Sequence, residues 1–115
     1  DTEFDYSDDM DPFDYERLCA NEFSKNGWDA KATQGSSDQG VDVVAEKANR
    51  TLVAQCKRFA KPVGNKAVQE VVAGMKFYDA NEGIVIAPNG FTVSAKKLAK
   101  ANKVKLIHHS EINSL

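Results

Sequence analysis

The sequence predicts an α/β fold, a three-layer α/β/α sandwich with a mixed central sheet, and three observations support it. Two short β-branched runs, residues 41–45 and 51–56, flank a short charged turn and indicate an antiparallel hairpin. The unbroken apolar run at 83–87 is typical of a strand buried on both faces. Helical patterns lie before, between and after these runs, and the late strand–helix–strand unit requires a right-handed crossover with parallel pairing.

The first helix is expected to begin at Asp11 and Pro12, since Asp suits the N-cap and Pro the first helical position. Its apolar stripe ends before Asn26 and Gly27, which stop the helix. Residues 28–33 alternate like a half-buried strand, with Trp28 in the core. Residues 34–39 form a turn before the hairpin.

After the hairpin, Asn65 is expected to cap a helix from residue 66 to about 78. Thr92 or Ser94 then opens a helix to about 102, and residues 104–107 form the last strand before a terminal helical turn. The expected order is therefore α-β-β-β-α-β-α-β. The buried side of the middle helix is expected to use Val68, Val71, Val72, Met75 and Phe77 or Tyr78.

The length of 115 residues suits one domain. Residues 1–10 have few apolar anchors and are expected to be an acidic disordered or linker segment, leaving 11–115 as a single domain. Because the chain starts at Asp1, we expect it to be excised from a longer protein with further domains. No apolar stretch approaches the ~20 residues that span a bilayer. Cys19 and Cys56 lack metal-ligand spacing and indicate reduced residues of a cytoplasmic protein.

Charge is unevenly spread along the chain. Residues 1–14 hold seven of the 17 acids and no base, so the other 101 residues carry 15 basic and ten acidic side chains. Clustered bases are the footprint of a phosphate-binding face. The cluster at 57–66 adjoins the polar residues described next, whereas that at 96–105 is more typical of a solvated helix face. His108 and His109 are interpreted as strand-end surface residues rather than metal ligands.

A carboxylate, an amide and an ammonium group are expected to meet on the hairpin. Gln55 and Lys57 are two residues apart in a strand and point to one face, and the neighbouring strand can bring Asp42 beside them. With the Cys56 carbonyl, these oxygens suit Mg²⁺, which prefers hard ligands and keeps several waters. The pattern indicates metal-assisted phosphodiester hydrolysis. A surface hairpin with polar residues on its wet face is the alternative.

The chain resembles the Mrr-type restriction endonuclease domain of the PD-(D/E)xK nuclease superfamily. The central motifs are Gly40-Val41-Asp42 and Gln55-Cys56-Lys57-Arg58. The order and spacing of the pieces make the match specific, and they extend over nearly all of residues 12–115. The matching pieces are residues 13–18, 26–28, 35–43, 55–58, 61–64, 68–70, 83–86, 90–92 and 95–99.

The resemblance implies an Mg²⁺-dependent endodeoxyribonuclease, with Mn²⁺ as a substitute, on the restriction endonuclease-like fold. It makes Asp42 a metal ligand, Gln55 the second ligand in place of the commoner Glu, and Lys57 the catalytic lysine. It also puts Glu16 near the metal. Gln69 lines the site, or is merely an exposed helix residue. The residues expected to contact DNA are Gly40, Arg58, Lys61, Lys66 and Gln69.

Two other functions remain open at this point. A nuclease-like module that binds DNA but has lost cleavage is one, although Asp42, Gln55 and Lys57 are all present. A small doubly wound ligand-binding domain built on residues 83–107 is the other, but its loop lacks a phosphate-binding glycine fingerprint. A homodimer is compatible with each.

Overall fold

The computed structural model describes residues 5–33 and 41–115, so the turn expected at 34–39 and Gly40 lie outside the described residues. The predicted order of helices and strands is confirmed, with a 3₁₀ helix as the terminal turn. The elements are α1 (Pro12–Lys25), β1 (Asp29–Ala32), β2 (Val43–Lys47), β3 (Arg50–Cys56), α2 (Asn65–Phe77), β4 (Glu82–Ile86), α3 (Val93–Asn102), β5 (Lys105–Ile107) and η1 (His109–Ser114).

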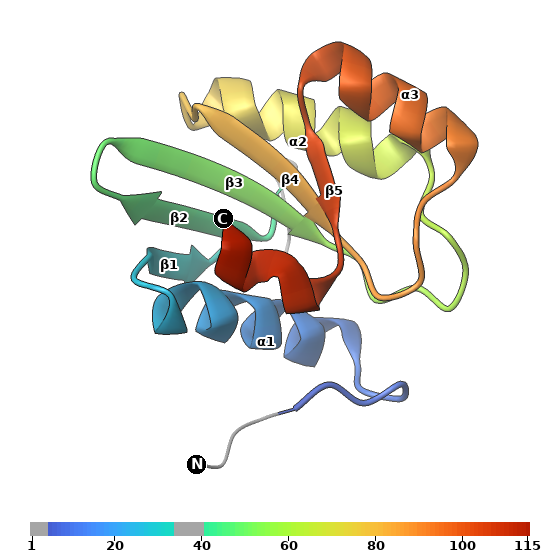
Figure 1. Ribbon diagram of the computed structural model, residues 1–115, viewed down its shortest axis with the longest axis horizontal. Coiled ribbons are helices and arrows are strands. Elements are labelled where there is room, and N and C mark those ends of the chain that lie inside the picture. The colour runs from blue at the N-terminus through green and yellow to red at the C-terminus, as the bar shows by residue number, and fades with distance from the viewer. Residues whose placement is uncertain (1–4, 34–40) are drawn as a thin grey trace.

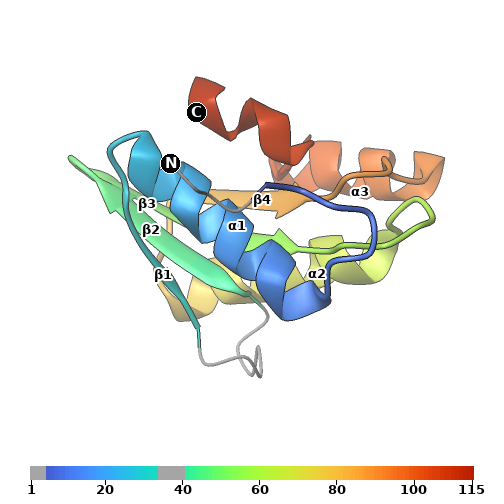
Figure 2. The same cartoon turned by 90° about the horizontal axis from the view of Figure 1, so that it is seen from below.

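The sheet is mixed, as predicted. Its five strands follow the order β1-β2-β3-β4-β5. The β1–β2 and β2–β3 pairs are antiparallel, whereas β3–β4 and β4–β5 are parallel. Helix α1 and η1 cover one face, and α2 and α3 cover the other, which makes the three-layer sandwich (Figure 1). Figure 2 views the same layers from the side of α1.

Strand β3 carries the alternation that orients the polar residues at its end. Leu52, Ala54 and Cys56 pack in the core under α1, whereas Val53 packs in the core under α2. Side chains two residues apart in a strand share a face. Gln55 therefore follows Val53 toward α2, and the polar end of the strand is directed to the layer formed by α2 and α3.

Helix α2 lies close to the sheet because β4 offers it a glycine. A Cβ built on Gly83 would lie 2.6 Å from Cγ1 of Val71 and 2.5 Å from Sδ of Met75, too close for any real side chain. Glycine therefore permits the close approach of α2 to β4. The side chains on the same flank of α2 are thereby brought within reach of β3.

Both caps expected at α1 and α3 are present, but the one expected at α2 is not. The side chains of Asp11 and Thr92 accept hydrogen bonds from the first turns of α1 and α3. Asn65 instead lies inside α2, and Gly64 occupies the N-cap with no side-chain hydrogen bond. Of the two alternatives at the end of the buried side of α2, Tyr78 packs against the core, whereas Phe77 is exposed. None of the described helices has the length and apolar composition that a bilayer span requires.

The two histidines are more deeply placed than expected for strand-end surface residues. His108 caps η1, and His109 Nδ1 lies 2.9 Å from the Tyr15 hydroxyl of α1. Tyr6 stacks on the His109 ring at 4.7 Å, so part of the segment expected to be loosely held contacts the domain. Burial lowers the pKa of His109 to about 4, which keeps it neutral.

Candidate active site

Asp42 is held in a bend just before β2, between two neighbouring strands. Its N–H donates to the carbonyl of Ala54 at 2.8 Å, and its carbonyl accepts from Thr33 N–H at 2.8 Å. The Asp42 Oδ2 atom accepts from the backbone N–H of Cys56 at 2.9 Å. With 4% of its surface exposed, Asp42 is a buried carboxylate that accepts a hydrogen bond from a backbone N–H at the end of β3.

Gln55 and Lys57 meet a carboxylate from α2. Gln55, 1% exposed, donates from Nε2 to Glu70 Oε1 at 2.7 Å. The Lys57 ammonium lies 3.4 Å from the same oxygen. One carboxylate oxygen of Glu70 therefore joins the amide and the lysine that the sequence placed on one strand face.

Glu70 was missed in the sequence analysis, which considered its neighbour Gln69. Gln69 is exposed, in keeping with the alternative given for it, and Glu70 is half-buried. Helical periodicity could have identified Glu70 as a residue that faces the sheet. Ala67 and Gly74 are buried in α2, and Glu70 is three residues after the first and four before the second, so it shares their face. Gln69 is only two residues from Ala67 and points away.

Glu16 reaches the site from α1, on the opposite face of the sheet. Its carboxyl interacts with Asp42 through charge and a side-chain hydrogen bond. It also interacts with the positive charge of Lys57. Burial, followed by the Asp42 carboxylate, raises the pKa of Glu16 to about 7, while Lys57 partly opposes the rise. The two carboxyl groups therefore face each other where β3 ends, and the charge of Asp42 disfavours the ionised form of Glu16.

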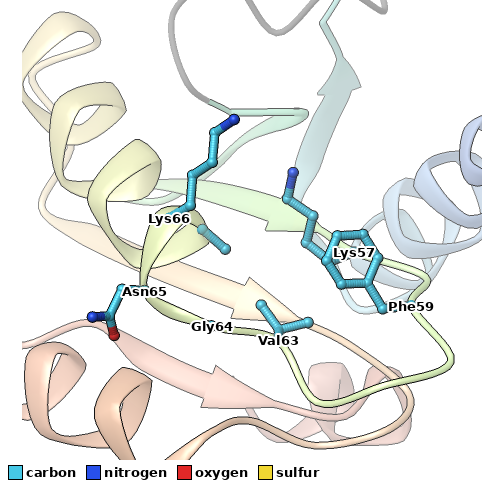
Figure 3. A pocket seen from close by; sticks show the side chains of 7 residues that line it. Lys57, Phe59, Val63, Gly64, Asn65 and Lys66 are labelled. Carbon is cyan, nitrogen blue, oxygen red and sulfur yellow. The ribbon is translucent and has the colours of Figure 1, made fainter.

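The basic residues expected to contact DNA have different surroundings. Arg58 donates from Nη1 to the carbonyl of Asp8 at 3.0 Å, so the acidic N-terminal segment contacts it directly. Lys61 is exposed in the loop after β3. Lys57 and Lys66 line one pocket, with their ammonium groups on the same side of it (Figure 3). Gly40 lies outside the described residues.

The comparison of sequences is decisive for the family. Residues 7–115 match the Mrr restriction endonuclease family over almost the whole chain. The chain belongs to this family. None of the curated protein sequences compared with this Mrr-type domain matches it.

Solved structures share the fold of this Mrr-type domain at low sequence identity. A protein of unknown function, AF1548, has a TM-score of 0.66 and 22% identity over 84% of this chain and 58% of its own. EndoMS in complex with dsDNA has a TM-score of 0.64 and 18% identity over 93% of this chain and 46% of its own. MspJI restriction endonuclease with a 27-mer oligonucleotide has a TM-score of 0.60 and 19% identity, over 87% and 26%. The chain spans about half of these proteins or less.

The donor set of this Mrr-type domain suits a hard cation that keeps water ligands. Asp42 and Glu16 offer carboxylate oxygens, and Gln55 offers an amide oxygen. Within the described ranges, no three His, Cys, Asp or Glu side chains gather closely enough to hold an ion by themselves. Mg²⁺ commonly binds through one or two carboxylates with several waters. The residues present therefore fit such an ion, and the role of the Cys56 carbonyl stays a prediction.

We expect Glu16→Gln to remove a pH dependence from the stability of the metal-free domain. Because the folded pKa of Glu16 is raised from 4.5 to about 7, protonated Glu16 stabilises the fold fully below pH 4.5. This contribution is lost as the pH rises through 7. Melting temperatures in EDTA should therefore decline over this window more steeply for the parent than for Glu16→Gln.

His109 gives the stability of the fold the opposite dependence on pH. Its folded pKa is lowered, so the stabilising effect of the neutral ring is lost on acidification. This effect is common to both proteins and cancels in their difference. Glu46→Gln, at an exposed position of β2, serves as the matched control and should follow the parent. Parallel curves for the parent and Glu16→Gln would show that Glu16 titrates normally.

Proposed function

We propose that this domain is a divalent-metal-dependent DNA endonuclease that hydrolyses phosphodiester bonds, of the restriction or DNA-processing type. The observation that carries the proposal is the convergence of Asp42, Gln55 and Lys57 at the end of β3, with Glu16 supplied from α1. Similar folds have been solved with DNA, in EndoMS with dsDNA and MspJI with an oligonucleotide. Membership of the restriction endonuclease family supports the same reaction.

Asp42, Gln55 and Glu16, with the Cys56 carbonyl, would hold Mg²⁺ or Mn²⁺. When bound, the cation would supply charge stabilisation at the phosphate and a lowered pKa for a bound water. Asp42 is fixed by the Cys56 N–H, so it needs little rearrangement to act. The partly buried Lys57 ammonium, 3.4 Å from Glu70, would also stabilise the negative charge that grows on the phosphate oxygens.

Glu70 supplies, from the neighbouring helix, a negative charge that Gln55 lacks. The commoner Glu at position 55 would bring a carboxylate, whereas Gln55 brings a neutral amide whose nitrogen is bonded to Glu70. This bond fixes the orientation of the Gln55 amide, with its nitrogen toward Glu70 and its oxygen on the other side. The same carboxylate lies 3.4 Å from the Lys57 ammonium. Glu70 therefore positions both the amide and the lysine.

A charge exchange between positions 55 and 70 tests this role. Gln55→Glu alone places two carboxylates at hydrogen-bond distance, and Glu70→Gln alone removes the anion beside Lys57. We expect each single change to slow cleavage about tenfold or more, since a hydrogen bond to a charged group contributes roughly 1.5–3 kcal/mol. The double variant restores one carboxylate and one amide, and should recover most of the parent rate.

Single-turnover nicking at a series of Mn²⁺ concentrations measures these effects, with melting temperatures to verify folding. Recovery in the double variant should include the metal dependence, because a merely structural contact would restore stability alone. A double variant that is as slow as the product of the two single losses would show that the pair does not act together.

The function itself is tested by incubating the domain with supercoiled plasmid and Mg²⁺, Mn²⁺ or EDTA. Nicked or linear product with a metal and intact plasmid with EDTA are expected. Duplex binding without cleavage in either metal would favour the DNA-binding module that has lost cleavage. Because phosphate contacts position the DNA without reading its sequence, we propose that another part of a longer protein selects the target.

A further inference from the structure

We propose that the pocket beside Lys57 binds a nucleotide whose base has left the duplex stack. On this reading, which rests on the proposed nuclease function, the domain prefers DNA with an unpaired nucleotide next to the cleaved phosphate. The pocket has a volume of about 310 Å³, in the lower part of the roughly 300–1,000 Å³ range of small-molecule sites. It is lined by Lys57, Phe59, Val63, Gly64, Asn65, Lys66 and Ala67 (Figure 3).

Phe59 gives the pocket an exposed aromatic face. Its side chain is 47% exposed, and among the described residues only Phe13, Phe77 and Val93 are other large apolar side chains left so open. The backbone of Phe59 is nevertheless fixed. Its N–H donates to the Lys57 carbonyl at 3.0 Å, and its carbonyl accepts from Asn89 Nδ2 at 2.6 Å. A half-exposed ring on an anchored backbone, with the ammonium group of the candidate catalytic lysine over it, is suited to stacking on its open surface.

The other residues that line the pocket suit the two parts of a nucleotide, with apolar side chains for the base or sugar and ammonium groups for the phosphate. Val63 and Ala67 are buried and apolar, so they present a floor suited to a base or sugar. The ammonium groups of Lys57 and Lys66 lie on the same side of the pocket, whereas the Asn65 amide is turned away (Figure 3). Gly64 leaves space, since a Cβ there would meet nothing within 4 Å. A free phosphate would use only the lysines, but a nucleotide would also cover Phe59 and the floor.

The position of the pocket implies that the base is unstacked. Lys57 belongs both to the candidate active site and to the pocket lining, and its Nζ lies 5.8 Å from the centre of the Phe59 ring. A base in a paired duplex has both faces covered by its neighbours, so it can reach Phe59 only after leaving the stack. Unstacking has a free-energy cost, which is least for an unpaired base. Stacking on an aromatic residue offsets much of this cost.

Three duplexes of one sequence test the proposal. The first is fully paired, the second carries one unpaired nucleotide, and the third carries an abasic residue in place of that nucleotide. Single-turnover rates with Mn²⁺ are measured at the phosphates that flank the varied position. We expect the unpaired nucleotide to be cleaved about tenfold faster than the abasic residue, a ratio equivalent to roughly 1.4 kcal/mol of base stacking.

Phe59→Ala should reduce this ratio to near one, whereas Phe59→Trp should keep it. Phe77→Ala is the matched control, because Phe77 is 59% exposed near the other end of α2 and should leave the ratio unchanged. Melting temperatures verify that each variant is folded. Equal rates on the unpaired and abasic duplexes, or a ratio that survives in Phe59→Ala, would overturn the pocket assignment and leave the nuclease proposal intact.

The two proposals can also fail separately. If the parent cleaves none of the duplexes with Mg²⁺ or Mn²⁺, the nuclease proposal fails. The pocket is then tested in EDTA by the binding of a single-stranded oligonucleotide. Binding that weakens about tenfold in Phe59→Ala but not in Phe77→Ala would support the pocket. Equal binding by both variants would refute it.

Discussion

Asp42→Asn is expected to abolish DNA cleavage while leaving the metal-free domain at least as stable as the parent. A lost metal ligand removes several kcal/mol of charge stabilisation, which corresponds to a rate loss of roughly 10³-fold or more. Stability should not suffer, because an Asn oxygen can still accept the Cys56 N–H that Asp42 now accepts. The change also removes the charge that Glu16 faces, so the cost of ionising Glu16 falls.

Plasmid nicking and thermal melting, each with Mn²⁺ and with EDTA, measure the two parts of this prediction. The parent should gain stability when metal is added, and the variant should gain little. Asp29→Asn, an exposed change of the same kind on β1, should behave like the parent. If Asp42 only satisfies the backbone at the strand end, the metal-free melting temperature should drop and nicking by the folded fraction should persist.

Lys57→Ala is expected to remove cleavage with metal affinity retained or increased. The change deletes a positive charge aimed at the reacting phosphate, and losing one such donor costs roughly 10²–10³-fold in rate. No oxygen ligand is removed. Because Lys57 opposes the charges of Glu16 and Glu70, its absence leaves the site more negative and therefore no weaker for a cation.

Calorimetric titration with Mn²⁺ beside a nicking assay separates the two effects. Lys76→Ala makes the same substitution at an exposed position in the last turn of α2 and should retain activity. Lys57→Arg keeps the charge but changes its shape and reach, so partial activity is expected. Undiminished nicking by Lys57→Ala would remove this lysine from the mechanism.

Local patterns were sufficient for the elements and for part of the site. Asp11 is predictable as a helix start, and so is Thr92 as one of two candidates with Ser94, because an N-cap depends on a side chain and the backbone three residues away. Gln55 and Lys57 were placed together because the period of a strand is two. The antiparallel hairpin, in which Val43 is opposite Ala54, brings Asp42 beside them at the end of β3.

Features that depend on contacts between segments far apart in sequence could not be predicted from local patterns. Asn65 has the chemistry of an N-cap, but the chain enters α2 one residue earlier through Gly64, whose pocket-facing side is open. Phe77 and Tyr78 both fit the apolar stripe of α2, but Tyr78 packs against the core and the Phe77 ring is exposed. The roles of these residues depend on where each helix meets the sheet.

By itself, the sequence determined the mixed α/β fold and the strand motif that ends in Gln55 and Lys57, because periodicity and capping act over a few residues. Only the tertiary structure decided that Glu16 from α1 and Glu70 from α2 reach this motif from opposite faces of the sheet. It also decided that Phe59 stays half-exposed, with the Lys57 ammonium over its ring. Burial and the proximity of charges depend on how the layers pack, because packing sets the distance between each helix and the sheet.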